Sequence, residues 1–124
     1  MAPSLKLFSA FLVLCIFKQG WAATCTISNI VVTQAKTGAS VEGQPEYEVT
    51  IANNCICSQS NVMVRCAGFS SVEKVNPALF KPLDGVLCLV NNGDGIFQSS
   101  PIKFKYAWKT PSDLSPASSQ INCS

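Results

Sequence analysis

The chain has 124 residues, with nine Lys and Arg, seven Asp and Glu, and no histidine. The lack of histidine excludes the Ser-His-Asp and Cys-His nucleophile systems and removes the commonest general base. The formal net charge of +2 comes without a basic cluster, so the sequence shows no footprint for nucleic acid. Composition therefore argues against the common hydrolases and against a nucleic-acid-binding protein.

The first predicted element in chain order is a secretory signal peptide over residues 1–22. Lys6 precedes an apolar run over residues 7–17, and the segment ends on the small residue Ala22. A basic start, an apolar run of about 7–15 residues and a small residue before the cleavage point are typical of such peptides. The run is also shorter than the roughly 20 residues that span a bilayer. We predict a soluble mature domain over residues 23–124, without a membrane segment.

Removal of the signal peptide changes the counts that matter. Lys6 and Lys18 leave, so nine basic residues become seven, against seven acidic ones. Cys15 also leaves, so seven cysteines become six. In an oxidising compartment an even set of six indicates a disulfide framework, and a metal site is disfavoured because zinc sites prefer CxxC pairs and histidine. The predicted disulfide cysteines are Cys25, Cys55, Cys57, Cys66, Cys88 and Cys123.

The pair Cys55 and Cys57 restricts how these cysteines can join. On extended chain their Cα atoms stand ~6.6 Å apart, at the far limit of a disulfide, and a bond between them would close a strained ring. We therefore predict that Cys55 and Cys57 bond to separate partners. The remaining pairings stay open.

Short segments in which apolar and polar residues alternate follow the first cysteine. The clearest is 46–52, where Tyr47, Val49 and Ile51 share one face, as in a half-buried strand. Gly, Pro, Asn and Asp punctuate the chain between such segments. Strands are predicted at 25–33, 46–52, 61–66, 69–75, 85–90 and 101–110, with turns at 36–38, 42–45, 76–77, 81–85 and 91–95.

Short strands with regular turns predict an all-β fold, a compact antiparallel β-sandwich or barrel-like domain stapled by disulfides. No helical stripe with a cap interrupts this pattern. The tail over 112–119 is rich in Ser and Pro. We predict that this tail is loose and that Cys123 pins it.

Two carboxylates on one strand face are the arrangement closest to an enzyme site. Glu46 and Glu48 stand at roughly the 5–10 Å separation of glycosidase carboxylates. A solvated outer face explains them better, because no pocket-forming insertion lies near. Asp84 and Asp94 lie in Gly-containing turns, where Asp is favoured for its backbone hydrogen bonds. We expect no enzyme activity, no catalytic residue, no metal site and no cofactor.

The segment 101–110 carries aromatic residues on one face and lysines on the other. Such an aromatic row is either the core face of a strand or a platform on which sugars stack, as in a cell-wall carbohydrate-binding module. The lysine face is either plain exposed surface or a contact for an acidic partner. The aromatic residues are Phe104, Tyr106 and Trp108, and the lysines are Lys103, Lys105 and Lys109.

Three longer strings carry a family resemblance, together with the order of the six cysteines. They are VTIANNCICSQSNVMVRCAGFSSV, FKPLDGVLCLVNNGDGI and SSPIKFKYAWKTPSDL. They resemble the tapetum determinant family of plant secreted proteins over residues 25–123. The resemblance implies a small cysteine-rich ligand in the apoplast that binds a leucine-rich-repeat receptor kinase ectodomain and directs cell fate in the developing anther. Founding members carry a longer segment with a basic processing site before the first cysteine, so this chain resembles a short paralogue.

Function in such a ligand is expected to reside in exposed loops and strand edges. We predict partner contacts in the 76–85 turn, in the 91–95 loop and on the lysine face of 101–110. The alternative, a carbohydrate-binding module, requires that Trp108 be exposed. The predicted contact residues are Lys81, Asp84, Asn92, Asp94, Lys103, Lys105 and Lys109.

Overall fold

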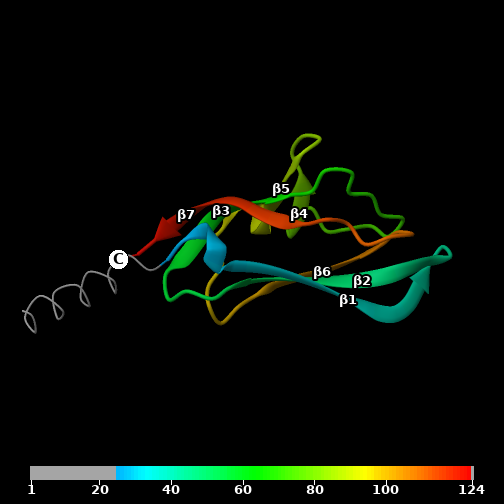
Figure 1. Cartoon of the computed structure of the whole chain (residues 1–124), viewed down its shortest axis with the longest axis horizontal. Helices are drawn as coiled ribbons and strands as arrows, with labels where there is room; N and C mark the ends of the chain where they lie inside the picture. Colours follow the sequence, from blue (N-terminus) through cyan, green and yellow to red (C-terminus); the bar gives the residue numbers. More distant parts are fainter. Residues whose placement is uncertain (1–24, 124) are drawn as a thin grey trace, which may run out of the picture.

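Two antiparallel sheets lie face to face in the computed structural model, which describes residues 25–123 (Figure 1). The predicted signal peptide lies outside the described residues. Sheet A has the order β1-β2-β6, and sheet B has the order β4-β5-β3-β7. The elements are η1 (Ile27–Asn29), β1 (Ile30–Val41), β2 (Gln44–Asn53), β3 (Ser58–Arg65), β4 (Phe80–Pro82), β5 (Leu87–Val90), η2 (Asn91–Gly93), β6 (Ile102–Ala107) and β7 (Ser115–Asn122).

The all-β prediction is confirmed, and the two sheets form a sandwich rather than a closed barrel. Each sheet has two edge strands, β1 and β6 in sheet A and β4 and β7 in sheet B. Within the described residues, no helix has the length and hydropathy needed to cross a membrane.

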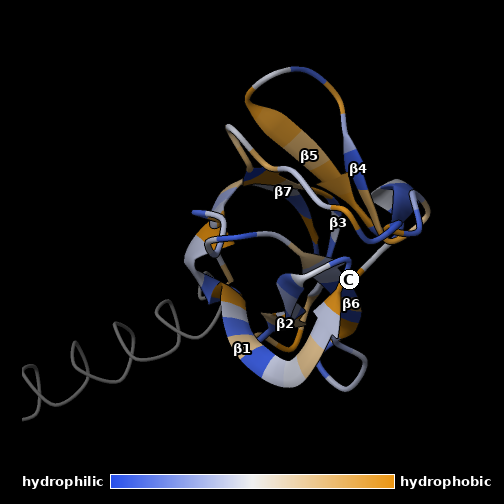
Figure 2. Cartoon of the chain, turned by 90° about the vertical axis from the view of Figure 1, so that its right-hand side faces the viewer, coloured by the Kyte–Doolittle hydropathy of each residue, from blue (hydrophilic) through white to orange (hydrophobic). Residues whose placement is uncertain are grey.

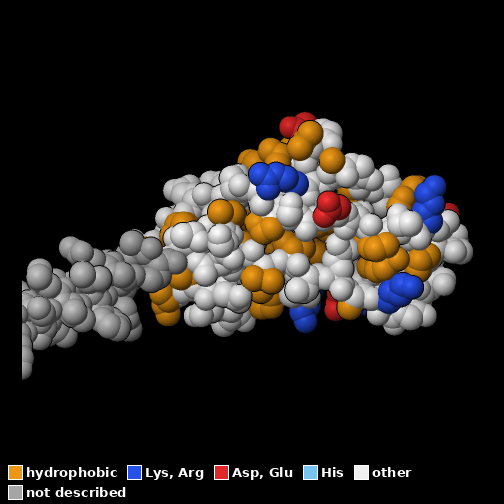
Figure 3. Space-filling view, in the orientation of Figure 1, with side chains coloured by type: hydrophobic (Ala, Val, Ile, Leu, Met, Phe, Trp, Pro, Cys, Tyr) orange, Lys and Arg blue, Asp and Glu red, His pale blue; other side chains and the backbone are white. Residues whose placement is uncertain are grey.

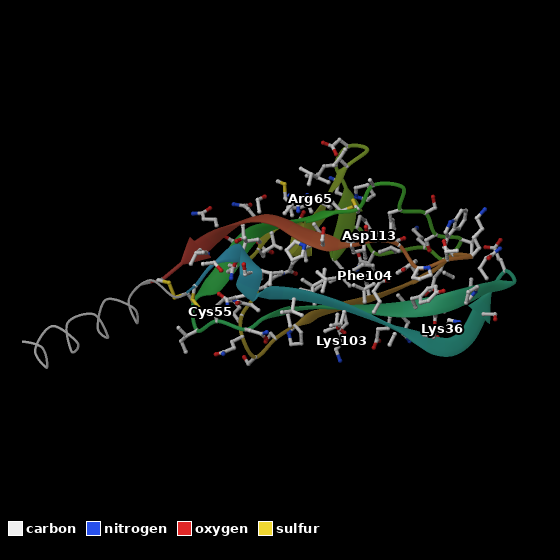
Figure 4. The ribbon with its side chains drawn as sticks, viewed as in Figure 1. Lys36, Cys55, Arg65, Lys103, Phe104 and Asp113 are labelled. Carbon is white, nitrogen blue, oxygen red and sulfur yellow. A yellow bond between two sulfur atoms is a disulfide. The ribbon has the colours of Figure 1, made fainter. Side chains whose placement is uncertain are left out.

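The core lies between the sheets and follows the predicted alternation on β2. Tyr47, Val49 and Ile51 are buried and pack toward sheet B. The ring of Phe104 on β6 stacks on Phe80 of β4, with 4.4 Å between ring centroids (Figure 4). Sheet B differs from β2 in this respect, because its strand β5 is hydrophobic along its whole length (Figure 2). Burial of these large side chains is the main force that holds the two sheets together.

The first predicted strand, 25–33, is wrong at its start. Residues 27–29 form the 3-10 helix η1, which Thr26 caps by accepting a hydrogen bond from the Ser28 amide at 3.2 Å. The strand then begins at Ile30 and continues through the predicted turn at 36–38. The pairing with β2 shifts between Lys36 and Ser40, where Gly38 has a φ of 91°, a conformation that glycine adopts without strain. The signal for a turn therefore marked a bulge.

The predicted strand at 69–75 is also wrong. This segment is irregular and lies over the end of β6, where the Val72 amide donates to the Ala107 carbonyl at 2.9 Å. The Ala107 amide in turn donates to the Ser71 hydroxyl at 3.0 Å. The ring of Phe69 fits between those of Phe80 and Tyr106 in edge-on contacts. Its apolar residues therefore cover the core without joining a sheet.

The tail is not loose. Residues 115–122 form β7, which pairs with β3 from Ser58 opposite Asn122 to Arg65 opposite Ser115. Pro116 lacks an amide donor but is tolerated because β7 is an edge strand. Backbone pairing to β3 thus orders a sequence that shows little alternation of its own. The turn predicted at 81–85 overlaps the last two residues of a strand, since β4 runs over Phe80–Pro82.

Candidate binding surfaces

The six cysteines form three disulfides, Cys25–Cys55, Cys57–Cys123 and Cys66–Cys88, with Cα–Cα distances of 5.7, 4.9 and 6.0 Å. Cys55 and Cys57 have separate partners. Their two bridges lie at the end of the sandwich where the described chain begins and ends (Figure 4). We call the four cysteines of these two bridges the clasp.

Two buried side-chain amides hold the backbone of the clasp. Asn53 donates to the carbonyls of Cys57 and Ile96 at 2.8 and 2.9 Å, and its Oδ1 accepts from the Cys55 amide at 3.0 Å. Gln59, which is fully buried, donates to the Thr26 carbonyl at 3.0 Å. Because the Asn53 amide bonds to the backbone of both Cys55 and Cys57, and the Gln59 amide to the residue after Cys25, the cysteines of the clasp are positioned by hydrogen bonds as well as by the disulfides.

The β4–β5 hairpin, residues 80–90, is the most prominent projection of sheet B (Figure 1). Leu83 and Val86 flank its tip with 46% and 54% of their surface exposed. In Figure 3 hydrophobic side chains gather around an acidic group at this projection. Exposed apolar pairs on a projecting turn are typical of contact surfaces rather than of core.

Three kinds of bond fix the hairpin. The Asp84 Oδ1 accepts from the amides of Val86 and Leu87 at 2.8 and 2.7 Å. These two hydrogen bonds lower the pKa of the Asp84 carboxyl below its ordinary value, and the bond from the Leu87 amide has the larger effect. The Leu83 amide donates to the Leu87 carbonyl at 2.9 Å. At the base, the buried bridge between Cys66 and Cys88 ties β5 to the end of β3. The hairpin is therefore ordered before any partner arrives.

A pair of carboxyl groups lies at the opposite end of the molecule from the clasp. Glu46 was predicted on a solvated face but is only 9% exposed, because residues 71–73 cover it. The Thr37 hydroxyl donates to its Oε1 at 2.7 Å, and this bond, followed by the effect of the neighbouring Glu73 carboxyl, lowers the Glu46 pKa. Burial, then the contact with Glu46, raises the pKa of Glu73. Each carboxyl of the pair therefore shifts the pKa of the other.

The structure separates the predicted contact residues into two groups, although all seven are exposed. Lys81 and Asp84 lie on the β4–β5 hairpin, and the loop with Asn92 and Asp94 follows β5 at the base of that hairpin. The three lysines belong to the other side. Lys103 and Lys105 project from the outer face of sheet A, as Lys103 does in Figure 4, and Lys109 follows β6 with its Nζ 5.7 Å from the centroid of the Trp108 ring.

The aromatic row of β6 belongs to the core. Tyr106 is fully buried and Phe104 is 6% exposed, while Trp108 is half-buried against the core. Tyr106 stacks on Tyr47 with 5.4 Å between ring centroids. A sugar-stacking platform needs open ring faces, so Phe104 and Tyr106 cannot belong to the predicted platform, and Trp108 is only partly exposed.

Residues 26–124 match the protein family described as "Tapetum determinant 1, C-terminal". The chain belongs to this family. Among curated proteins, it is 38% identical over 101 residues to "TPD1 protein homolog 1" of Arabidopsis thaliana, covering 80% of this chain and 55% of that protein. No solved structure matches the chain.

Two rice relatives add to this similarity. "TPD1 protein homolog 1A" of Oryza sativa subsp. japonica is 30% identical over 95 residues, which are 70% of this chain and 42% of that protein. "TPD1 protein homolog 1B" is 33% identical over 85 residues, which are 68% and 50%. The chain thus spans about half the length of the curated relatives it matches.

Sequence reasoning in this family member missed its exposed apolar residues. Ile56 and Phe97 near the clasp are 83% and 60% exposed, and Leu83 and Val86 occupy the hairpin tip. Each of the four lies in or beside a segment with turn residues, where an apolar side chain has no sheet face to turn inward. An apolar residue in or beside a predicted turn was therefore the available signal for an exposed apolar side chain.

Proposed function

We propose that this chain is a secreted plant signalling ligand that binds the ectodomain of a leucine-rich-repeat receptor kinase and directs cell fate, in anther or other reproductive development. Membership of the tapetum determinant family supports this function, as do the plant relatives. Three disulfides suit a protein that works in the apoplast. A repeat ectodomain offers a long surface on which a small rigid domain can lie.

The observation that carries the proposal is the prearranged β4–β5 hairpin. Its tip exposes Leu83 and Val86, while Asp84 and the Cys66–Cys88 bridge fix its backbone. A loop that is ordered beforehand loses little conformational entropy on binding, so more of the contact energy appears as affinity. Apolar side chains at the centre of an interface are where such energy concentrates.

The test is a binding screen of the oxidised, purified protein against plant receptor-kinase ectodomains, by surface plasmon resonance. We expect a dissociation constant of about 1 μM or below for at least one ectodomain. Replacement of both Leu83 and Val86 by Ala is expected to weaken that binding by about tenfold or more.

Val31→Ala is the matched control, because Val31 is 37% exposed on the outer face of sheet A, away from the hairpin. It should leave the affinity unchanged. Failure of every ectodomain tested would contradict the receptor-ligand function. Binding that the hairpin variant does not weaken would retain the function and reject the hairpin as its surface.

A further inference from the structure

The two bridges of the clasp lie close enough to exchange sulfur atoms. The Sγ atoms of Cys25, Cys57 and Cys123 all lie within 4.8 Å of one another. Cys25 is bonded to Cys55, whereas Cys57 and Cys123 are bonded to each other. Cys25 is therefore the sulfur of the first bridge that faces the second bridge.

One bridge of the clasp is open to solvent. Cys123 is exposed and Cys57 is half-buried, whereas Cys55 is 8% exposed. The third disulfide differs, because Cys66 and Cys88 are 4% and 0% exposed. A thiol from solvent can therefore reach Cys123 far more readily than it can reach the bridge at the base of the hairpin.

The exposed bridge forms part of the wall of a hollow of about 360 Å³. Ile56 and Phe97, the two most exposed large hydrophobic side chains of the described chain, stand beside it. The buried amide of Asn53 fixes the backbone of Cys55 and Cys57, so the side chain between them points outward. The lining residues are Ile56, Cys57, Ser58, Phe97, Asn122 and Cys123.

We propose that the clasp is a thiol-exchange site, which accepts a dithiol with an apolar body at Cys123 and passes the exchange on to Cys25. The apolar side chains Ile56 and Phe97 favour a dithiol with an apolar body over a charged one. This site is separate from the β4–β5 hairpin and does not depend on the receptor-ligand function.

The chemistry runs in two balanced stages. A thiolate of the dithiol attacks Cys123 Sγ, forms a mixed disulfide and releases Cys57 as a thiolate; its second thiol then closes the oxidised dithiol and frees Cys123. Two electrons and two protons pass from the dithiol to the Cys57–Cys123 bridge. In the second stage either freed thiolate attacks Cys25 Sγ and expels Cys55 as a thiolate, with no net redox change.

The exchange leaves the hairpin intact. Its product keeps one bridge at the clasp, from Cys25 to Cys57 or to Cys123, and leaves two free thiols, Cys55 and the member of the Cys57–Cys123 pair that did not react. Because Cys66 and Cys88 lie in the core, their bridge keeps the β4–β5 hairpin in place throughout. The site would therefore change how the two ends of the described chain are joined without disturbing the hairpin.

The experiment exposes the folded, fully oxidised protein to limiting dithiothreitol, quenches samples with N-ethylmaleimide, and maps bridges in non-reduced peptides by mass spectrometry. We expect alkylation of Cys57 and Cys123 at least about tenfold faster than that of Cys66 and Cys88. Peptides that join Cys25 to Cys57 or Cys123, with alkylated Cys55, are expected next. Native bridges followed only by full reduction, or equal reduction of all three bridges, would overturn the proposal.

Two variants test the separate steps. Replacement of Cys57 and Cys123 by Ser removes the attacking sulfurs, so we expect reduction of Cys25–Cys55 to slow about tenfold or more relative to the wild-type protein. Circular dichroism before each run shows whether that variant is folded. The bridge mapping of the wild-type protein tests the proposal even if the variant does not fold. Phe97→Ala should lower the rate ratio of benzene-1,2-dimethanethiol, an apolar dithiol that closes a six-membered cyclic disulfide, to dithiothreitol several-fold. Unchanged rates in both variants would reject the relay and the apolar wall.

Discussion

The two ends of the sandwich are closed by different chemistry. At one end the clasp joins the beginning and end of the described chain through two disulfides. We call the other end the polar end. There a hydrogen bond from Thr37 to Glu46 joins β1 to β2. The bond from the Ala107 amide to Ser71 joins β6 to the irregular 69–75 segment, and the Glu46 and Glu73 carboxyls lie beside it. One end therefore responds to thiols and the other to protons, although both belong to the same pair of sheets.

Each end also holds part of the chain that has few apolar contacts of its own. The clasp fixes β7, an edge strand of mainly small polar residues. At the polar end Tyr106 fixes the approach to β7, since its hydroxyl donates to Gln34 and accepts from the Ser112 amide. Covalent and polar restraints thus replace burial where burial is weak.

The largest expected effect comes from opening the clasp. Replacement of Cys57 and Cys123 by Ser removes a bridge that spans 66 residues. Chain entropy alone predicts a loss of about 4 kcal/mol in the free energy of unfolding. Guanidinium denaturation followed by circular dichroism measures this loss, which should be the same near neutral and at mildly acid pH. A loss below about 1 kcal/mol would show that β3–β7 pairing holds the tail without the bridge.

A smaller effect is expected at the polar end from Tyr106→Phe. The change keeps the ring but leaves Gln34 and the Ser112 amide without their partner, which should cost about 1–2 kcal/mol. The same denaturation experiment measures it, and addition of a reductant that opens the clasp should not alter the difference. Tyr47→Phe, on the ring stacked against Tyr106, is the matched control and is expected to cost less. Equal losses would mean that the hydroxyl network contributes nothing.

The sequence predicted those strands that bury one face in the core. It did not predict the segments whose structure depends on hydrogen bonds to neighbouring elements. The alternation in 46–52 and 101–110 located β2 and β6, because their apolar side chains form the core. The 69–75 segment has apolar residues at every third position, Phe69, Val72 and Val75, and its Val72 amide bonds to the end of β6 and not along a strand. β7 alternates little and is a strand because β3 offers it backbone partners. Bonds to neighbouring elements therefore determine both outcomes, including the bond that the Ser71 hydroxyl accepts from the Ala107 amide.

The same limit applies to the candidate surfaces. Exposure of the seven predicted contact residues follows from charge and turn position, and each is exposed. Their division between two sides of the molecule depends on the order of the strands in the sheets, and the alternation of apolar and polar residues does not predict that order. The disulfide partners depend on sheet order too. Leu83 lies in the 76–85 turn that was predicted as a contact region, whereas Val86 was predicted in a strand at 85–90 and instead precedes β5, at the exposed tip of the hairpin.

The smallest expected effect is a pH dependence at the polar end. Both carboxyls have an ordinary pKa of 4.5. The lowered pKa of Glu46 gives stability that is present above that value and is lost as pH falls through the folded-state pKa. The raised pKa of Glu73 gives stability that is complete below that value and is lost as pH rises through its own folded-state pKa. Stability from the pair is therefore greatest near pH 4.5.

Glu73→Gln tests this dependence, since the amide of the glutamine can donate permanently to the Glu46 carboxylate. The wild-type protein should lose stability relative to this variant as pH rises from about 5 to about 8, measured by guanidinium denaturation at each pH. Glu48→Gln is the matched control, because Glu48 lies on the same strand opposite Lys105 and should leave the slope unchanged. Lys105 acts on both members of the pair and favours their charged forms, which limits the slope. Parallel pH profiles for the wild-type protein and Glu73→Gln would mean that the two carboxyls titrate independently, and that the polar end is held by Thr37 and the Ser71–Ala107 contact alone.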